Sequence, residues 1–171
     1  SRLNIDGSLD GNFEAGTDPS YVNLLALQPD GRILVGGDFG QQSRPGVRRL
    51  NADETLDTSF DVDADDEVTS LVVQADGKIL VCGDFTTISG QSRSHIGRLN
   101  ADGTIDTNFN PGADGVVFSL ALQADGKILV GGLFSTLGGQ SRSRIGRLNA
   151  TEPATQSLSY DGSTITWLRG G

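Results

Sequence analysis

The chain of 171 residues has no methionine, one cysteine, one histidine and one tryptophan. Its single cysteine, Cys82, excludes an intrachain disulfide framework, so cysteine content does not indicate a compartment. No apolar run approaches the roughly 20 residues that a membrane-spanning helix needs, and no signal-peptide pattern opens the chain. We therefore expect no membrane insertion. Because methionine is absent even at position 1, we expect a processed product or a piece of a longer protein.

Basic residues are also scarce, with two lysines and 11 arginines against 22 acidic residues. The formal net charge of −9 repels phosphate backbones, which argues against a nucleic-acid partner. Apolar residues make up 36% of the chain, and the 24 glycines bring this total near the usual value for globular proteins. No window of helical periodicity escapes interruption by Asp-Gly or Gly-Gly, so we expect almost no helix.

What the chain has instead is internal repetition. The triplet Arg-Leu-Asn begins at positions 2, 49, 98 and 147, and phenylalanines recur at 13, 60 and 109. Asp-Gly recurs at 30/31, 76/77 and 125/126. A period of about 48 residues indicates units that stack side by side, because one such unit cannot bury its own apolar face.

Turn chemistry predicts the structure of one unit. The apolar runs 68–74 and 79–83 are separated by Ala-Asp-Gly, which favours a hairpin. In the first copy the loop reads Pro29-Asp30-Gly31, which fits a type I turn followed by a left-handed glycine. A second hairpin around Arg98–Gly103 gives four strands per unit, and the more apolar first hairpin should be the inner pair.

We therefore predict an all-β fold, a β-propeller or partial propeller built from four-stranded repeats of about 48 residues. The glycine pairs 36/37 and 131/132, and Cys82-Gly83 between them, should lie where a side chain would collide with the next blade. Cys82 is interpreted as a small buried filler. One repeat-built domain should span 1–171, with a half repeat 1–13, repeats at about 22–60, 68–109 and 116–149, and a degenerate half repeat 155–171.

The repeated motif, LQxDGKILVGGxF followed by a Gly-Gln-Ser-Arg loop and IGRLNxDGxxDxxF, resembles the Delta-60 repeat family, a tandem β-propeller-like repeat of large bacterial proteins. The resemblance covers about 1–150 and implies an architecture, with no catalytic residues and no agreed activity. The first copy departs from the motif, because its loop FGQQSRPGV is three residues shorter. It also has Glu54 where the other copies have Gly7 and Gly103.

Calcium is the one cofactor that the sequence suggests, since oxygen ligands at alternate positions of a tight glycine turn suit a hard cation. An arginine stands where the first carboxylate ligand should be, and the alternative is that this arginine replaces the cation by pairing with the aspartates across the turn. The type I turn also explains Asn, Asp and Gly without metal. The candidate ligands are Asn4, Asp6, Asp10, Asn100, Asp102 and Asp106.

Repeated Gln-Ser-Arg loops are candidates for a ligand-binding rim, on which several copies could contact an acidic or sugar ligand together. The alternative, that each arginine ties its loop to carboxylates of the adjacent blade, is favoured because every repeat has the feature. The acidic run 61–67 is interpreted as a solvated loop between blades. The rim residues are Gln42, Arg44, Gln91, Arg93, Gln140 and Arg142.

The sequence contains no set of side chains with the types and spacing that a catalytic site requires. The only histidine, His95, adjoins a loop and is expected at the surface, and the repeated phenylalanines are expected in the core. Among the aromatics that do not repeat, Tyr21 and Tyr160 are more informative about recognition, and Trp167 should be packed. Paired carboxylates could still meet at a propeller centre and hydrolyse glycosides.

We predict a non-catalytic structural or interaction module of a secreted or cell-surface bacterial protein, with a protein or glycan partner. The alternative is a carbohydrate- or calcium-dependent binding module, and a glycosidase-like enzyme is third. A hairpin near Leu158–Leu168 could be completed by the strands around Leu3–Phe13, closing a four-bladed ring. Otherwise the chain would pair with a second copy or expose a sheet edge.

Overall fold

The computed structural model describes residues 2–11, 19–40, 42–149, 156–160 and 165–169. Over these ranges the chain forms antiparallel strands, bridges and turns, and no helix. The described residues therefore contain no helix that is long and apolar enough to cross a bilayer. The predicted all-β fold is confirmed.

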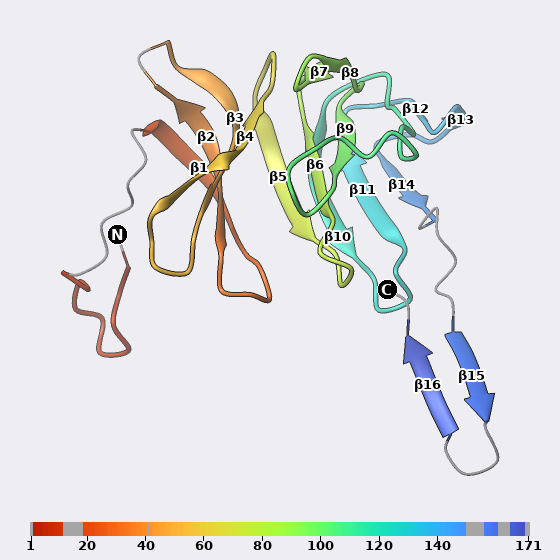
Figure 1. Ribbon diagram of the computed structural model, residues 1–171. Coiled ribbons are helices and arrows are strands. Elements are labelled where there is room, and N and C mark those ends of the chain that lie inside the picture. Colours follow the sequence, from red (N-terminus) through yellow and green to blue (C-terminus); the bar gives the residue numbers. More distant parts are fainter. Residues whose placement is uncertain (1, 12–18, 41, 150–155, 161–164, 170–171) are drawn as a thin grey trace.

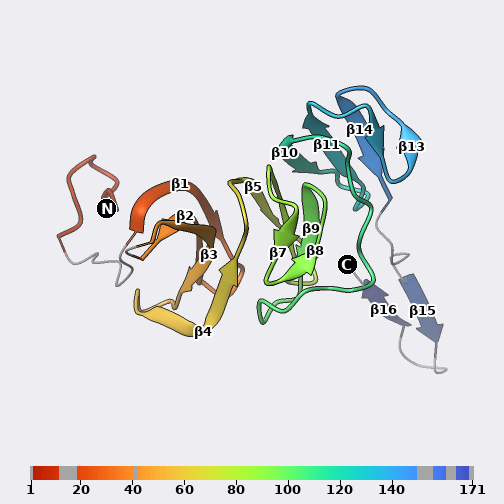
Figure 2. The same ribbon diagram turned by 90° about the horizontal axis from the view of Figure 1, so that it is seen from above.

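Three sheets follow one another along the chain and lie side by side as successive blades (Figures 1 and 2). The first contains β1 (Pro19–Leu27), β2 (Ile33–Phe39), β3 (Arg44–Leu50) and β4 (Leu56–Asp63). The second contains β5 (Val68–Val73), β6 (Ile79–Gly83) and β9 (Ile96–Leu99). The third contains β10 (Val117–Leu122), β11 (Ile128–Gly132) and β14 (Ile145–Leu148).

Short hairpins complete the second and third blades at one end of the sheets. They are β7 (Thr87–Ile88) with β8 (Gln91–Ser92), and β12 (Thr136–Leu137) with β13 (Gln140–Ser141). A separate hairpin pairs β15 (Gln156–Tyr160) with β16 (Ile165–Arg169).

The prediction of four strands per repeat holds fully only for the first blade. In the second blade the fourth strand is reduced to a single bridge between Leu99 and Ile105. The first repeat continues β4 through Val62, which pairs with Val47, whereas the next repeat has Pro111 at the position of Val62. Proline has no N–H to donate to a strand ladder, which accounts for the early end of pairing.

The hairpin loops have the predicted geometry. The amide of Gly31 donates to the carbonyl of Gln28 at 3.0 Å, and the amide of Gln28 donates to the carbonyl of Arg32 at 2.9 Å. Gly31 has a φ of 85°, the left-handed conformation that glycine adopts without steric cost. Gly77 and Gly126 repeat the same bonds with φ of 83° and 79°.

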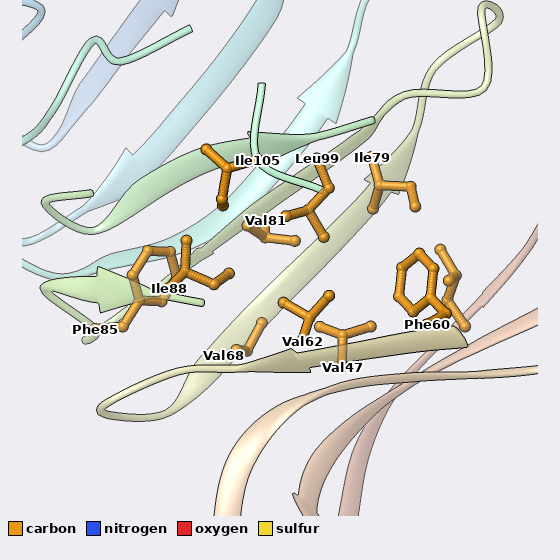
Figure 3. Close-up of a cluster of buried hydrophobic side chains, with 11 residues drawn as sticks. Val47, Phe60, Val62, Val68, Ile79, Val81, Phe85, Ile88, Leu99 and Ile105 are labelled. Carbon is orange, nitrogen blue, oxygen red and sulfur yellow. The ribbon is translucent and has the colours of Figure 1, made fainter. Parts of the chain in front are cut away.

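Two apolar clusters lie between the blades and form most of the core. The cluster between the first two blades brings side chains of β3 and β4, such as Val47 and Phe60, against β6 and β9, such as Val81 and Leu99 (Figure 3). A second cluster, which includes Phe109, joins the second and third blades in the same way. Strand β5 packs against both β1 and β10, which confirms that the first hairpin of each repeat is the inner pair.

The glycine pairs are required, but for a different contact from the predicted one. A Cβ built on Gly37, Gly83 or Gly132 would lie 2.0–2.2 Å from a carbonyl oxygen of the preceding strand in its own hairpin, and not of the next blade. The first strand of each hairpin is bulged at this point, which brings its backbone close. Cys82 is fully buried, as expected, and burial raises the pKa of its thiol to about 12.

The described strands do not form the predicted four-bladed closed ring. In the opening segment 2–10 the only bridge joins Leu3 to Leu9, and β15 and β16 pair with each other. No described strand pair connects that segment to β15 or β16, and the segment and the β15–β16 hairpin lie at opposite ends of the array (Figure 2). Within the described residues the blades form an open array.

Candidate functional site

An arginine, an aspartate and a phenylalanine meet in the second half of the first and second repeats, and we call this group the arginine clamp. Arg49 donates from Nε and Nη2 to Asp57 Oδ2 at 2.9 and 2.7 Å, and its guanidinium lies 4.4 Å from the centre of the Phe60 ring. In the next repeat Arg98 donates to one oxygen of Asp106 at 2.8 Å from both Nε and Nη2. The predicted pairing of arginine with the aspartate across the turn is confirmed.

The clamps differ mainly in burial. The side chain of Arg98 is 2% exposed and that of Arg49 is 5% exposed, whereas that of Arg2, which pairs with Asp10, is 51% exposed. The hydroxyl of Ser59 and the guanidinium of Arg49 lower the pKa of Asp57 to about 2. Burial acts to raise the pKa of Asp106, but its hydrogen bonds and the adjacent cations outweigh it and lower the pKa.

The remaining calcium candidates are engaged in the turn itself. The side-chain amides of Asn4 and Asn100 donate from Nδ2 to the hydroxyls of Ser8 and Thr104, at 3.0 and 2.9 Å. Oδ1 of Asp6 accepts from the amide and hydroxyl of Ser8, and Asp102 accepts in the same way from Thr104. These bonds lower the pKa of both aspartates, with the hydroxyl as the largest cause.

Across the described ranges, no three His, Cys, Asp or Glu side chains converge as a metal site. The arginine clamp and the Asx turns occupy carboxylates that the calcium hypothesis assigned to the cation. Calcium binding therefore stays a proposal that a chelation experiment must test.

The Gln-Ser-Arg loops do not form one uniform rim. Gln42, Gln91 and Gln140 are exposed. They belong to the turn between β2 and β3, to β8 and to β13, and these elements lie at the same end of the three blades (Figure 1). Their arginines differ. Arg93 is buried and donates to the carbonyl of Ser92 at 2.7 Å, and Arg142 makes the equivalent bond to Ser141 while exposed.

Arg44, in the shorter first loop, donates to Gln42 at 3.1 Å and lies 3.5 Å from Asp63 of its own blade. The structure thus shows loop arginines tied to their own repeat, and not to carboxylates of the adjacent blade. Gln91 and Asp102 line one shallow depression of about 300 Å³, together with Ser59 and Asp61.

The acidic run 61–67 is more than a solvated loop. Arg48 contacts Asp61 at 2.8 Å and Asp63 at 2.7 Å. Asp65 accepts hydrogen bonds of 2.8 Å from the amides of Thr86 and Thr87, which fastens the segment between two blades to the next blade. The interpretation as a solvated run was therefore wrong for these carboxylates, because tertiary packing brings them to partners about 20 residues away or on a paired strand.

The aromatic residues and His95 lie mostly where packing requires. The repeated phenylalanines of the described residues are buried, as predicted, and Phe13 lies outside those residues. His95 was expected at the surface, but its side chain is 14% exposed and Nδ1 lies 3.3 Å from the carbonyl of Gly83. The backbone of His95 has a left-handed φ of 65°. Tyr160 and Trp167 lie in β15 and β16, where no side chain is described.

A cleft of about 250 Å³ between the first and second blades is a candidate for ligand binding. It lies beside the inner strands, and Tyr21 in its wall is 55% exposed. Asn23 donates to the carboxylate of Glu67 and to the carbonyl of Val68, both at 3.1 Å, and its own Oδ1 is buried with no described hydrogen-bond partner. The polar lining consists of Tyr21, Asn23, Asp38, Asp66 and Glu67.

Sequence reasoning singled out Tyr21 but missed Asn23 and Asp38. The available signal was departure from the repeat, since Asn23 stands where the later copies have Thr69 and Phe118. Asp38 has an equivalent in Asp84, so only the meeting of two blades reveals its place in a cleft.

Repeated antiparallel sheets that pack face against face through inner strands define a β-propeller repeat protein. A family model described as "Domain of unknown function (DUF5122) beta-propeller" matches residues 28–60, 74–109 and 123–151, more than half of the chain. The chain belongs to this family. Neither a curated protein nor a solved structure matches it.

Proposed function

We propose that the chain is a non-catalytic structural and interaction module of a larger secreted or cell-surface bacterial protein. The observation that carries the proposal is that repeated and unrepeated polar side chains lie in different places. The repeated charges, as in Arg98 with Asp106, contact each other inside the repeat, whereas the unrepeated Tyr21 is exposed in a cleft. The resemblance of the repeat motif to the Delta-60 family supports the bacterial setting, and the net charge of −9 argues against nucleic acid.

The partner we propose at the cleft is a protein segment or a glycan. An exposed aromatic ring offers a flat apolar face, and the carboxylates of Asp38, Asp66 and Glu67 accept hydrogen bonds from hydroxyl or ammonium groups. The same combination favours carbohydrate binding as the second candidate function, because a sugar presents an apolar face and hydroxyl edges together.

A glycan array probed with the whole chain tests the carbohydrate candidate. Binding of any glycan should fall at least tenfold in Tyr21→Ala, since the stacking surface is removed. Leu133→Ala is the matched control, because Leu133 is similarly exposed and lies outside the cleft. Glycan binding that Tyr21→Ala leaves unchanged would remove the cleft from consideration, and an array without signal would leave a protein partner.

A panel of chromogenic glycosides tests the third candidate, a glycosidase-like enzyme. Turnover that disappears in Asp38→Asn would overturn the non-catalytic proposal. We expect no turnover, because the cleft carboxylates are assigned to binding and the clamp aspartates are held by arginine.

A further inference from the structure

The blade junctions can be compared with two faces, one on the first blade and one on the third, that no described blade covers. On the face that each blade turns toward the next, Val47 and Ile96 occupy equivalent positions of the first and second repeats and are fully buried. Ile145 has this position in the third repeat and is 68% exposed. Ile145 therefore lacks the burial against a following blade that Val47 and Ile96 have.

The opposite face shows the complementary pattern. Val68 and Val117, which begin β5 and β10, are 2% and 0% exposed because the preceding blade covers them. Val22 has the equivalent position in β1 and is 41% exposed. Leu25 is 71% exposed, whereas its equivalent in the third repeat, Leu120, is 9% exposed.

A polar contact of the junctions repeats in register as well. Asn23 Nδ2 donates to the carbonyl of Val68 at 3.1 Å, and Thr69 Oγ1, at the same repeat position, donates to the carbonyl of Val117 at 2.7 Å. In the third repeat this position is Phe118, which is 50% exposed. The two internal junctions thus use the same positions in the same order.

We name the open side of the third blade, with Phe118 and Ile145, the leading face. The open side of the first blade, with Val22, Leu25 and Leu27, is the trailing face. In segment 2–10 beside that blade, Leu3 is 65% exposed although its equivalents Leu50 and Leu99 are buried. Soluble monomers rarely leave contiguous apolar surfaces of this kind uncovered.

We propose that a second copy of this chain covers these faces, with the leading face of each copy against the trailing face of the other. The occupant follows from continuity with the internal junctions, because each open face presents apolar side chains at the repeat positions that pack against a neighbouring repeat of this sequence elsewhere in the chain. Such a contact is heterologous, so it either closes into a ring or extends into a filament. Two copies bring six blade sheets, which lies within the roughly four to eight blades of closed propellers. This association goes beyond ligand binding at the Tyr21 cleft and does not depend on it.

Light scattering coupled to size-exclusion chromatography, at micromolar concentration, tests the proposal with the whole chain. The unmodified chain should elute as a dimer, and Ile145→Glu and Leu25→Glu should each give monomers, because a carboxylate would be buried at both junctions. Leu133→Asp is the matched control. Leu133 is 61% exposed but stands where the other repeats have Asp38 and Asp84, so this variant should remain dimeric.

Mixing the two monomeric variants distinguishes head-to-tail packing from a symmetric contact. A mixture of Ile145→Glu and Leu25→Glu retains one junction with both native faces, so dimers should reappear. Circular dichroism of each variant should match the unmodified chain, and Ile145→Ser and Leu25→Ser replace any variant that does not fold. A monomeric unmodified chain overturns the proposal, as does loss of the dimer in only one of the two variants or a mixture that stays monomeric.

Discussion

The arginine–aspartate pair of the clamp occurs three times, and the arginine is exposed to a different degree in each. This difference allows a graded test of how much the pair stabilises the fold. We consider Arg98→Met and Arg2→Met, which remove the guanidinium and keep most of the apolar stem. Arg98 is 2% exposed and its partner Asp106 is 5% exposed, so the first variant leaves a carboxylate in a site from which water is excluded. The side chain of Arg2 is 51% exposed, so the second variant removes a guanidinium that water already solvates.

The expected costs follow from this difference. Removing one member of a buried ion pair typically destabilises a protein by about 3–5 kcal/mol, whereas an exposed pair contributes about 0–1 kcal/mol. Lys78 Nζ lies 3.3 Å from Asp106 Oδ2 and remains in Arg98→Met, which places the expected loss near the lower end, about 3 kcal/mol. The expected loss for Arg2→Met is about 0.5 kcal/mol. A domain of this size loses roughly 2–4 °C in Tm per kcal/mol, so the first change amounts to about 6–12 °C.

Urea unfolding followed by circular dichroism measures both free energies of unfolding. Arg98→Met with Asp106→Leu should recover part of the loss, because an apolar pair leaves no unpaired charge. Equal losses for Arg98→Met and Arg2→Met would refute the reasoning, since burial would then have no influence on the value of the clamp. So would a double variant that is less stable than the sum of the two single changes.

Four further results are expected. Gly83→Ala should prevent folding or cost more than about 3 kcal/mol, because its Cβ would lie 2.0 Å from the carbonyl oxygen of Glu67, whereas Gly97→Ala, with 3.5 Å of clearance, should unfold at nearly the same urea concentration. Asp57 has its pKa lowered to about 2, so it stabilises the fold above about pH 4 and loses this effect as the pH falls through 2; acid titration of Asp57→Asn should show a shallower loss of stability between these values, and an unchanged slope would contradict the assignment. The buried Cys82 thiol, whose pKa is raised to about 12, should react with a thiol reagent at pH 8 only after urea is added, and rapid labelling of the native chain would disprove its burial. Calcium should leave the Tm unchanged, and a rise that EDTA removes would restore the metal hypothesis.

Features that are local in sequence could be predicted, and features created by packing between blades could not. Pro29-Asp30-Gly31 and the pairing of Arg49 with Asp57 involve residues at most eight positions apart, and their chemistry alone determines the contact. Asn23 bonds to Val68 across a junction 45 residues apart, which no short motif reports. The left-handed φ of His95 could not be predicted either, because the types of the neighbouring residues do not indicate that conformation.

Arg48 illustrates a further limit on what the sequence alone can predict. It stands where the other repeats have Gly97 and Gly146, and its guanidinium lies 4.9 Å from the centre of the Phe39 ring. A single departure from a repeat can alter the surface of one blade, but its consequence depends on which loop lies opposite. In this case the aspartates of the acidic run lie there, which explains both the arginine and the run.

Three side-chain hydrogen bonds that cross from one blade to the next end on backbone carbonyls. Asn23 donates to Val68, Thr69 to Val117, and Arg49 to the carbonyl of Ala101 at 2.5 Å. A backbone acceptor is present whatever side chain its residue carries, so a neighbouring unit can change sequence without losing the bond. A gene for such an array can therefore be lengthened by duplicating segments of about 48 codons, and the copies can diverge independently afterwards.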